Sequence, residues 1–336
     1  MWTSIIGHGR QIDQLCKAIS SGRLPNAYLF AGPRGVGKRR AADELAASLV
    51  CSSPDSASSG ACGTCLACRK AASRTHPDLF LVLPEAQDPG WKPPEGKEKK
   101  PSEVIKVEQV RALQSALQFH PLEAKAKLAI IDDADRMNAS TANSLLKILE
   151  EPPPLTHFAL VSTMPNSLLP TIRSRSARLD FGPLSDGEIA AKIASEKGVA
   201  REEALRIARL SGGSLGTALA IDPEFLSDTI GRFLTLCRKA STADVLATAE
   251  GWSHRAPGEI RLTFDLLASF YRDCLRIAAA GGEVSAAHPE AFEMAPRIGA
   301  ARASRALSDI DSARRSFDTT ANKQLMFENL LFSLTS

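Results

Sequence analysis

The chain has 336 residues, of which 44% are hydrophobic and 24% charged, and its formal net charge is +3. This length allows two or three domains, and this balance is typical of a globular protein, which excludes a disordered or fibrous chain. The small net charge alone gives no argument for nucleic-acid binding.

The start of the chain lacks a basic region followed by an apolar stretch, and no apolar run approaches the roughly 18 residues that span a bilayer. Three of the seven cysteines form a C-x-x-C-x-x-C cluster. This usage indicates a reducing compartment and a metal site rather than disulfides. We therefore expect a cytoplasmic protein with no membrane partner.

The first predicted elements surround a glycine-rich loop. Residues 27–31 form a short apolar run that predicts a buried strand, and residues 39–50 have alanines and leucines at helical spacing. The segment between them, residues 32–39, reads GPRGVGKR. It fits the phosphate-binding motif G-x-x-x-x-G-K-[ST] except at its last position.

Each residue of this loop has an expected role. Three glycines, Gly32, Gly35 and Gly37, are expected to turn backbone N–H groups toward phosphate. Lys38 is expected to reach the outer phosphates, but Arg39 replaces the hydroxyl residue that ligates Mg²⁺. Arginine is always cationic and has no acceptor atom, so it cannot hold a metal ion. The loop can still bind a nucleotide or free phosphate, yet we expect no hydrolysis there.

A cysteine-rich segment follows, with the spacing C-x₁₀-C-x₂-C-x₂-C. Its members are Cys51, Cys62, Cys65 and Cys68. Four thiolates close a tetrahedral Zn²⁺ shell and leave no open position for catalysis, so we expect a structural zinc module over about residues 51–75. Cys51 could instead be a packed helix-end residue, with His76 as the fourth ligand. The other five histidines share no spacing, and we expect surface or satisfied interior groups.

The remaining elements of the first half alternate in type. The stretch 84–103 holds five prolines, two glycines and four lysines, which predicts a mobile surface insertion. Apolar and amphipathic runs predict further strands at 78–83, 127–132 and 158–163, and helices at 104–117 and 139–150. This alternation predicts an α/β fold with a parallel, doubly wound sheet, whose ligands lie at the carboxyl ends of the strands.

Two acids end the strand predicted at 127–132. Phosphate-loop proteins place a metal-associated aspartate there, often followed by a glutamate that polarises water. Asp132 fits the first role, whereas Asp133 is shorter than glutamate by one methylene.

From about residue 181 the chain changes to helical patterns. We expect a nucleotide-binding-like domain over 1–181, a small helical domain over 182–221 and an all-helical domain over 222–336.

Several long words of the sequence resemble the clamp-loader branch of the AAA+ proteins, and within it the delta-prime subunits of bacterial DNA polymerase III. The matching words lie at residues 22–30, 131–138, 143–153 and 169–176, so the resemblance covers roughly residues 1–220. It implies an AAA+ domain with helices on both faces of the sheet, then a helical lid and a helical collar. It also supports the zinc module, because ATPase-type subunits of this family carry a similar insertion.

The resemblance also implies roles for single residues. The family's Ser-Arg-Cys word corresponds to Ser174-Arg175-Ser176, and Arg175 would then point at the ATP of a neighbouring subunit. Thr163 matches the first sensor position near the outer phosphate. Gly216 stands where the second sensor is an arginine. The sequence thus differs from the family's motifs at three positions of its own nucleotide site: Arg39, Asp133 and Gly216. The arginine that would serve a neighbouring subunit, Arg175, is present.

The resemblance therefore predicts a clamp-loader subunit with little or no hydrolysis of its own, which supplies an arginine finger in trans. Its implied partners are the delta and gamma/tau subunits, the sliding clamp and primer-template DNA. Structural Zn²⁺ is the expected cofactor; ATP binding is left open, and Arg39 argues against Mg²⁺. The alternative is an ATP-hydrolysing motor subunit of the gamma/tau kind. A zinc-dependent DNA-binding module is disfavoured, because few basic residues and no interleaved aromatics lie near the cysteines.

Overall fold

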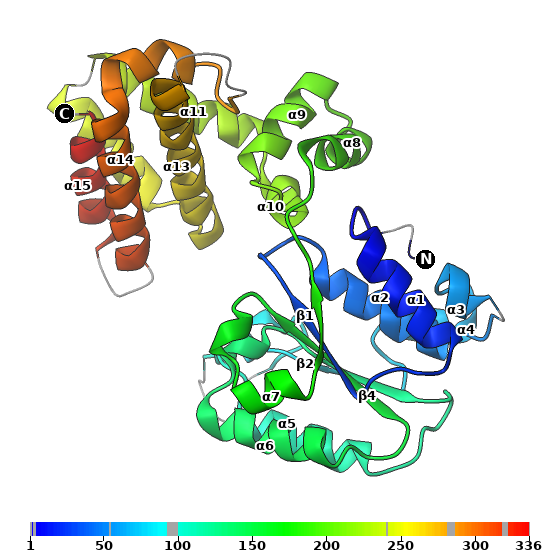
Figure 1. Ribbon diagram of the computed structural model, residues 1–336. Helices are drawn as coiled ribbons and strands as arrows, with labels where there is room; N and C mark the ends of the chain where they lie inside the picture. The colour runs from blue at the N-terminus through cyan, green and yellow to red at the C-terminus, as the bar shows by residue number, and fades with distance from the viewer. Residues whose placement is uncertain are drawn as a thin grey trace. The chain divides into compact units, whose positions relative to one another are not determined.

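The structure is a computed structural model that describes residue 2 and residues 5–53, 55–92, 100–239, 241–280, 286–317 and 322–335. Its residues form two compact units, Met1–Leu184 and Ser185–Ser336. The first unit is an α/β domain, and the described residues of the second are helical (Figure 1). No helix among the described residues is both long and apolar enough to cross a membrane.

A five-stranded parallel sheet forms the centre of the first unit. Its order is β2-β3-β4-β1-β5, and its strands are β1 (Ala27–Ala31), β2 (Leu79–Val82), β3 (Lys127–Ile131), β4 (Thr156–Ser162) and β5 (Ala177–Asp180). All residues of β1 and β3 are buried, because neighbouring strands and helices cover them on every side. The predicted parallel α/β sheet is confirmed. Strand β5 was not predicted, since only Leu179 of its four residues is buried.

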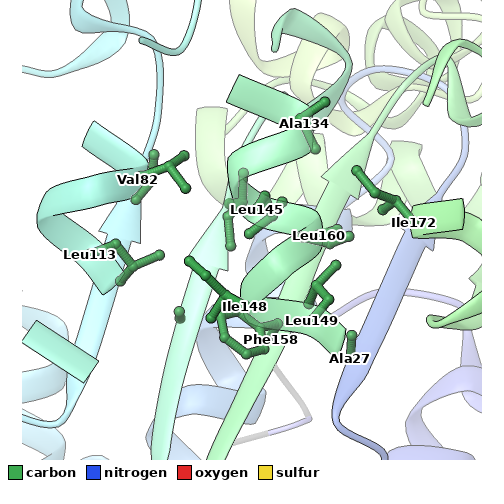
Figure 2. Packing of buried hydrophobic residues seen from close by; sticks show 14 of the residues in the cluster. Ala27, Val82, Leu113, Ala134, Leu145, Ile148, Leu149, Phe158, Leu160 and Ile172 are labelled. Carbon is green, nitrogen blue, oxygen red and sulfur yellow. The ribbon is translucent and has the colours of Figure 1, made fainter. Parts of the chain in front are cut away.

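Helices cover both faces of this sheet (Figure 1). They are α1 (Gly9–Ser20), α2 (Lys38–Val50), α3 (Ser56–Ser59), α4 (Leu66–Ala72), α5 (Val107–Leu117), α6 (Ala139–Glu150) and α7 (Pro170–Ser174). One core cluster joins α5 and α6 to the sheet through Leu113, Leu145, Ile148 and Phe158, as Figure 2 shows. The other joins α1 and α2 to the opposite face. The sheet is therefore a buried layer, and its carboxyl edge is left for the loops.

The described flanks of the proline-rich stretch are tied to the domain. A short 3₁₀ turn, η2 (Glu85–Gln87), follows β2, and the N–H of Ala86 donates to the carbonyl of Ser102 at 3.0 Å. The ammonium of Lys106 contacts the Glu85 carboxylate at 2.6 Å. The centre of the predicted mobile insertion, residues 93–99, lies outside the described residues.

Helices are the regular elements among the described residues of the second unit. They are α8 (Asp186–Lys197), α9 (Arg201–Leu210), α10 (Leu215–Ala220), α11 (Pro223–Lys239), α12 (Thr242–Ser253), α13 (Pro257–Ala280), α14 (Ala291–Phe317) and α15 (Lys323–Thr335). Buried aromatic rings fill the core of the last five, with Phe264 stacked on Phe327 at 5.5 Å and Trp252 edge-on to Phe327. The division between lid and collar expected at 221/222 stays a prediction, since both groups of helices belong to one compact unit.

Candidate functional site

The glycine-rich loop joins β1 to α2 at the carboxyl edge of the sheet. Gly32 has φ 151°, and a Cβ there would lie 2.1 Å from the carbonyl oxygen of Phe181, so only glycine fits. Gly35 and Gly37 also have positive φ, at 74° and 109°, and Gly37 caps the N-terminus of α2. The loop thus takes a left-handed path that leads into the N-terminus of α2, where free N–H groups favour an anion.

Lys38 is buried and bound by its own loop. Only 4% of the residue is exposed, and Nζ donates to the carbonyls of Gly32 at 2.7 Å and Pro33 at 2.6 Å. Burial lowers the pKa of this lysine, while the nearby carboxylates of Asp132 and Asp133 oppose that shift. The ammonium is therefore held inside the loop by two carbonyls.

Arg39 makes the contacts that decide the chemistry of the site. Its Nη1 donates to Oδ2 of Asp132 at 2.8 Å, and its Nε donates to Oδ1 of Asp43, one turn further along α2, at 2.9 Å. Burial alone would lower the pKa of Arg39, but the two carboxylates raise it above its ordinary value. A permanent cation thus bridges the loop helix and the end of β3. A Mg²⁺ ion would need free oxygen ligands from these same two elements.

Asp133 is bound by two neighbouring side chains. Its φ of 47° lies in the left-handed region, and its Oδ2 accepts from Nε2 of Gln87 at 2.7 Å and faces Nε of Arg136 at 3.4 Å. The carboxylate that stands where a glutamate would polarise water is therefore bound to other side chains.

The candidate sensor Thr163 is bound to another acid, Asp135. The Thr163 N–H and Oγ1 donate to the two oxygens of Asp135, at 2.9 and 3.2 Å. Burial alone would raise the pKa of Asp135, but donors from Ser162 and Thr163 lower it overall. Asp135 was missed by the sequence analysis, although it is the third acid of the Asp132–Asp135 word. Gly216, the second sensor position, lies in α10 of the other unit.

His8 is a further loop contact that the sequence did not indicate. Its Nε2 donates to the carbonyl of Val36 at 2.9 Å, and its ring packs edge-on against Phe181 at 4.8 Å. His8 lies just before α1, so the start of the chain braces the glycine-rich loop.

Arg175 lies on a surface turn at the end of α7, as the sequence indicated. Its Nη2 is 2.9 Å from Oε1 of Glu150, the last residue of α6, and its Nη1 donates to the carbonyl of Thr171 at 3.3 Å. The side chain is 40% exposed. Arg173 instead donates to Oδ1 of Asn166 at 3.0 Å. The two arginines of this turn are therefore aimed and held differently.

The four cysteines form a second site, remote in sequence from the loop's acids. The sulfurs of Cys51, Cys62, Cys65 and Cys68 all lie within 4.8 Å of one another. The Sγ atoms of Cys62 and Cys68 are 3.9 Å apart, and Zn–S bonds of about 2.3 Å in a tetrahedron require about 3.8 Å. The cluster can therefore hold a metal ion. His76 is not part of this group of sulfurs, and its Nδ1 accepts from the Asp78 N–H at 3.2 Å.

Backbone N–H groups contact three of the four sulfurs. The N–H groups of Cys62, Cys65 and Cys68 each donate to a sulfur of the cluster at 3.4 Å. Hydrogen bonds from Ser52 and from the Cys68 N–H lower the pKa of Cys65 to about 5, while burial raises that of Cys68 to about 12. The sulfurs would be the ligands of a structural zinc ion, and such N–H···S bonds would hold these ligands in place.

Comparison with known proteins points to one family. The family model "DNA polymerase III, delta subunit" matches residues 7–185. The DNA polymerase III subunit delta' of Pseudomonas aeruginosa is 36% identical over 234 residues, which cover 68% of this chain and 66% of that protein. The delta' subunit of Bacillus subtilis is 40% identical over 177 residues, 52% of this chain and 47% of that protein.

More distant relatives extend the match. The delta' subunit of Escherichia coli is 27% identical over 331 residues, 96% of this chain and 92% of that protein. A gamma/tau subunit of Mycobacterium tuberculosis is 29% identical over 242 residues, 70% of this chain and 39% of that protein. The chain thus spans less than two thirds of the Pseudomonas, Bacillus and Mycobacterium relatives.

Proposed function

Since the chain belongs to the delta-prime family of DNA polymerase III clamp-loader subunits, we propose that it is a non-hydrolysing subunit of such a loader. It would assemble in the cytoplasm with delta and gamma/tau subunits and help to load a sliding clamp on primer-template DNA. Its chemical contribution would be Arg175, supplied to the ATP of a neighbouring subunit.

The bond between Arg39 and Asp132 carries this proposal. Arg39 occupies the motif position whose hydroxyl would bind Mg²⁺, and Asp132 is the expected carboxylate ligand of that ion. The two side chains are instead bound to each other at 2.8 Å. A guanidinium has only donors, so no ligand for the metal remains on the loop side. Without Mg²⁺, the negative charge of the transferred phosphoryl group loses its main stabilisation at this site.

The other catalytic positions support the same conclusion. Thr163 is bound to Asp135 and Asp133 to Gln87, so neither side chain is free for a phosphate or a water molecule. Gly216 has no side chain to act as the second sensor. The loop amides and Lys38 remain, and we propose that they allow at most weak nucleotide binding that does not need Mg²⁺.

Arg175 suits a role in trans because it is half-exposed and lies on a turn outside the loop's own site. In this chain Glu150 and the Thr171 carbonyl hold its guanidinium. A neighbour's triphosphate carries more negative charge than one carboxylate, so the arginine can exchange Glu150 for phosphate oxygens. Arginine fingers stabilise transition-state charge and raise phosphoryl-transfer rates by roughly 10³–10⁵.

The alternative is an ATP-hydrolysing motor subunit, which the similarity to gamma/tau subunits raises. Arg39 and its two carboxylate partners argue against it. The cysteine cluster fits either role, and we propose that it holds one structural zinc ion through Cys51, Cys62, Cys65 and Cys68.

The isolated full-length chain is expected to hydrolyse no ATP above background, and its ATP affinity to be the same with Mg²⁺ and with EDTA. Phosphate release and equilibrium binding of fluorescent ATP measure both. In Arg39→Thr, a hydroxyl returns and Asp132 is freed, so Mg²⁺ should tighten ATP binding by roughly tenfold. Turnover by the wild-type chain that Lys38→Ala abolishes would contradict the proposal and favour the motor subunit.

A further inference from the structure

The second unit contains a polar cavity that plays no part in the proposed function. It has a volume of about 350 Å³ and lies where α9 and the start of α8 meet α13. Six of its eight lining residues are charged or polar; the eight are Asp186, Arg209, Gly212, Ser269, Arg272, Asp273, Arg276 and Ala287.

Three guanidinium groups line this cavity, and Asp273 is a nearby opposite charge for two of them, Arg272 and Arg276. Arg209 donates to the carbonyl of Ala286 at 3.2 Å, and Arg276 reaches Asp273 only at 3.8 Å. Arg272 makes no hydrogen bond or ion pair within the described part of the chain. Arg272 and Arg276 are one helical turn apart, a spacing at which like charges destabilise a helix. The fold thus keeps an unfavourable concentration of positive charge here.

The two acids of the cavity lie where backbone groups also stabilise negative charge. Asp273 is almost fully buried, and its Oδ2 accepts from the N–H groups of Ala287 at 2.7 Å and His288 at 3.0 Å. Asp186 lies in the first turn of α8, where the helix N-terminus stabilises negative charge. One oxygen of Asp273 is thus bound by the backbone, and the three guanidinium groups of the cavity exceed its two carboxylates by one positive charge.

His288 follows the lining residue Ala287, and its ring is neutral. It is fully buried, and neither ring nitrogen has a partner among the described residues, so the expectation of satisfied interior histidines is wrong here. Burial and the nearby charges of Arg206 and Arg272 lower its pKa to about 3, which keeps the ring neutral.

We propose that this cavity binds a phosphate group. Arg272 and Arg276 would hold its oxygens through their planar forks, and Arg209 would approach from the opposite wall. The Ser269 hydroxyl offers a further donor, and Gly212 leaves the wall open because it has no side chain. The phosphate can come from a free phosphoanion such as pyrophosphate or from a nucleic-acid backbone.

The test is calorimetric titration of the full-length chain with pyrophosphate in low salt. All proteins carry Lys38→Ala, so that the glycine-rich loop does not contribute. The variant Arg272→Gln/Arg276→Gln removes two guanidinium groups, and Arg232→Gln is the matched control, because Arg232 is exposed on α11 and pairs with Asp228.

We expect saturable binding that the double variant weakens at least about tenfold, since each charge-assisted bond contributes substantially to affinity. The control should bind within about twofold of its parent. Absence of saturable binding in the parent, or equal binding in the double variant, would overturn the proposal. Competition by oligothymidylate would identify a nucleic-acid backbone as the source of the phosphate, and undisturbed pyrophosphate binding a free phosphoanion.

Discussion

Two buried charged side chains hold the loop that joins α5 to β3. Asp78 is 1% exposed and accepts from three backbone N–H groups, those of Leu122, Glu123 and Ala124, at 2.7 to 2.8 Å. Lys127 is equally buried and donates to two carbonyls at the end of α5. Both charged groups make their hydrogen bonds to backbone groups, which makes the loop dependent on them.

Replacing Asp78 by Asn should destabilise the chain by about 2 kcal/mol near neutral pH, because charge-assisted hydrogen bonds are lost. Burial alone would raise the pKa of Asp78, but the three N–H donors lower it overall. The stabilisation is therefore present above the unfolded value of about 3.9 and is lost as pH falls through the folded pKa.

Urea unfolding of wild-type and Asp78→Asn protein between about pH 7 and pH 3 measures this difference. The difference in the free energy of unfolding between wild-type and Asp78→Asn protein should become smaller as the pH falls. Asp13→Asn, an exposed residue on α1, is the control and should show no such difference. A difference that stays constant with pH would mean that the charge of Asp78 is not what holds the loop.

Single residues also mark where sequence reasoning ended. The motif identified Arg39 as a departure, and its spacing of four from Asp43 was a usable signal for their ion pair. Nothing in the sequence indicated that Thr163 would pair with Asp135 or that Gln87 would bind Asp133. Those contacts depend on how the loops that follow β2, β3 and β4 pack together. The local periodicity of the sequence carries no information on that packing.

The glycine-rich loop owes its path to a backbone contact as well as to its dihedral angles. Gly32→Ala should cost more free energy of unfolding than Gly22→Ala. Both glycines have positive φ, but only Gly32 would place its Cβ against the Phe181 carbonyl. We expect about 1 kcal/mol for Gly22→Ala and well above 2 kcal/mol for Gly32→Ala. Thermal unfolding measures the loss of stability in each variant. An equal loss in Gly22→Ala and Gly32→Ala would mean that the Phe181 carbonyl does not restrict residue 32.

The cysteine module should bind one zinc ion per chain, and removal of the ion should expose residues 51–75 to protease while the sheet stays folded. Zinc binding in small peptide models is worth roughly 10–16 kcal/mol, whereas the sheet has a core of its own. Elemental analysis and limited proteolysis measure the two effects. Cys51→Ser should lose zinc, and His76→Asn should retain it. Retention in Cys51→Ser would remove that cysteine from the ligand set.

Secondary structure was predictable where apolar residues repeat at a clear period. The four predicted strands are apolar runs, buried in β1, β3 and most of β4 and half-buried in the edge strand β2. Strand β5 was not predicted because only Leu179 of its four residues is buried. Helix α1 was missed although Ile12, Leu15, Cys16 and Ile19 have the spacing of one helix face. The cysteine spacing predicted a metal site, and the fold favoured Cys51 over His76 because the end of α2 brings Cys51 to the cluster.

For the whole molecule, the proposed division of labour places the chain's contribution at a boundary with another subunit. In its own loop, Arg39 is bound to Asp132 where a Mg²⁺ ion would need oxygen ligands. Arg175 lies outside that loop and is half-exposed. Loss of Arg175 should therefore leave the isolated chain unchanged in stability and metal content, since a surface ion pair contributes little.

The most direct measurement is the DNA- and clamp-stimulated ATPase rate of a reconstituted loader that contains this chain as wild type, Arg175→Ala, Arg175→Lys or Arg173→Ala. We predict a large but partial loss for Arg175→Ala, because other ATP sites keep their own arginines, and a smaller loss for Arg173→Ala. Arg175→Lys should restore little, since lysine lacks the planar fork. A wild-type ATPase rate in the Arg175→Ala loader would contradict the account.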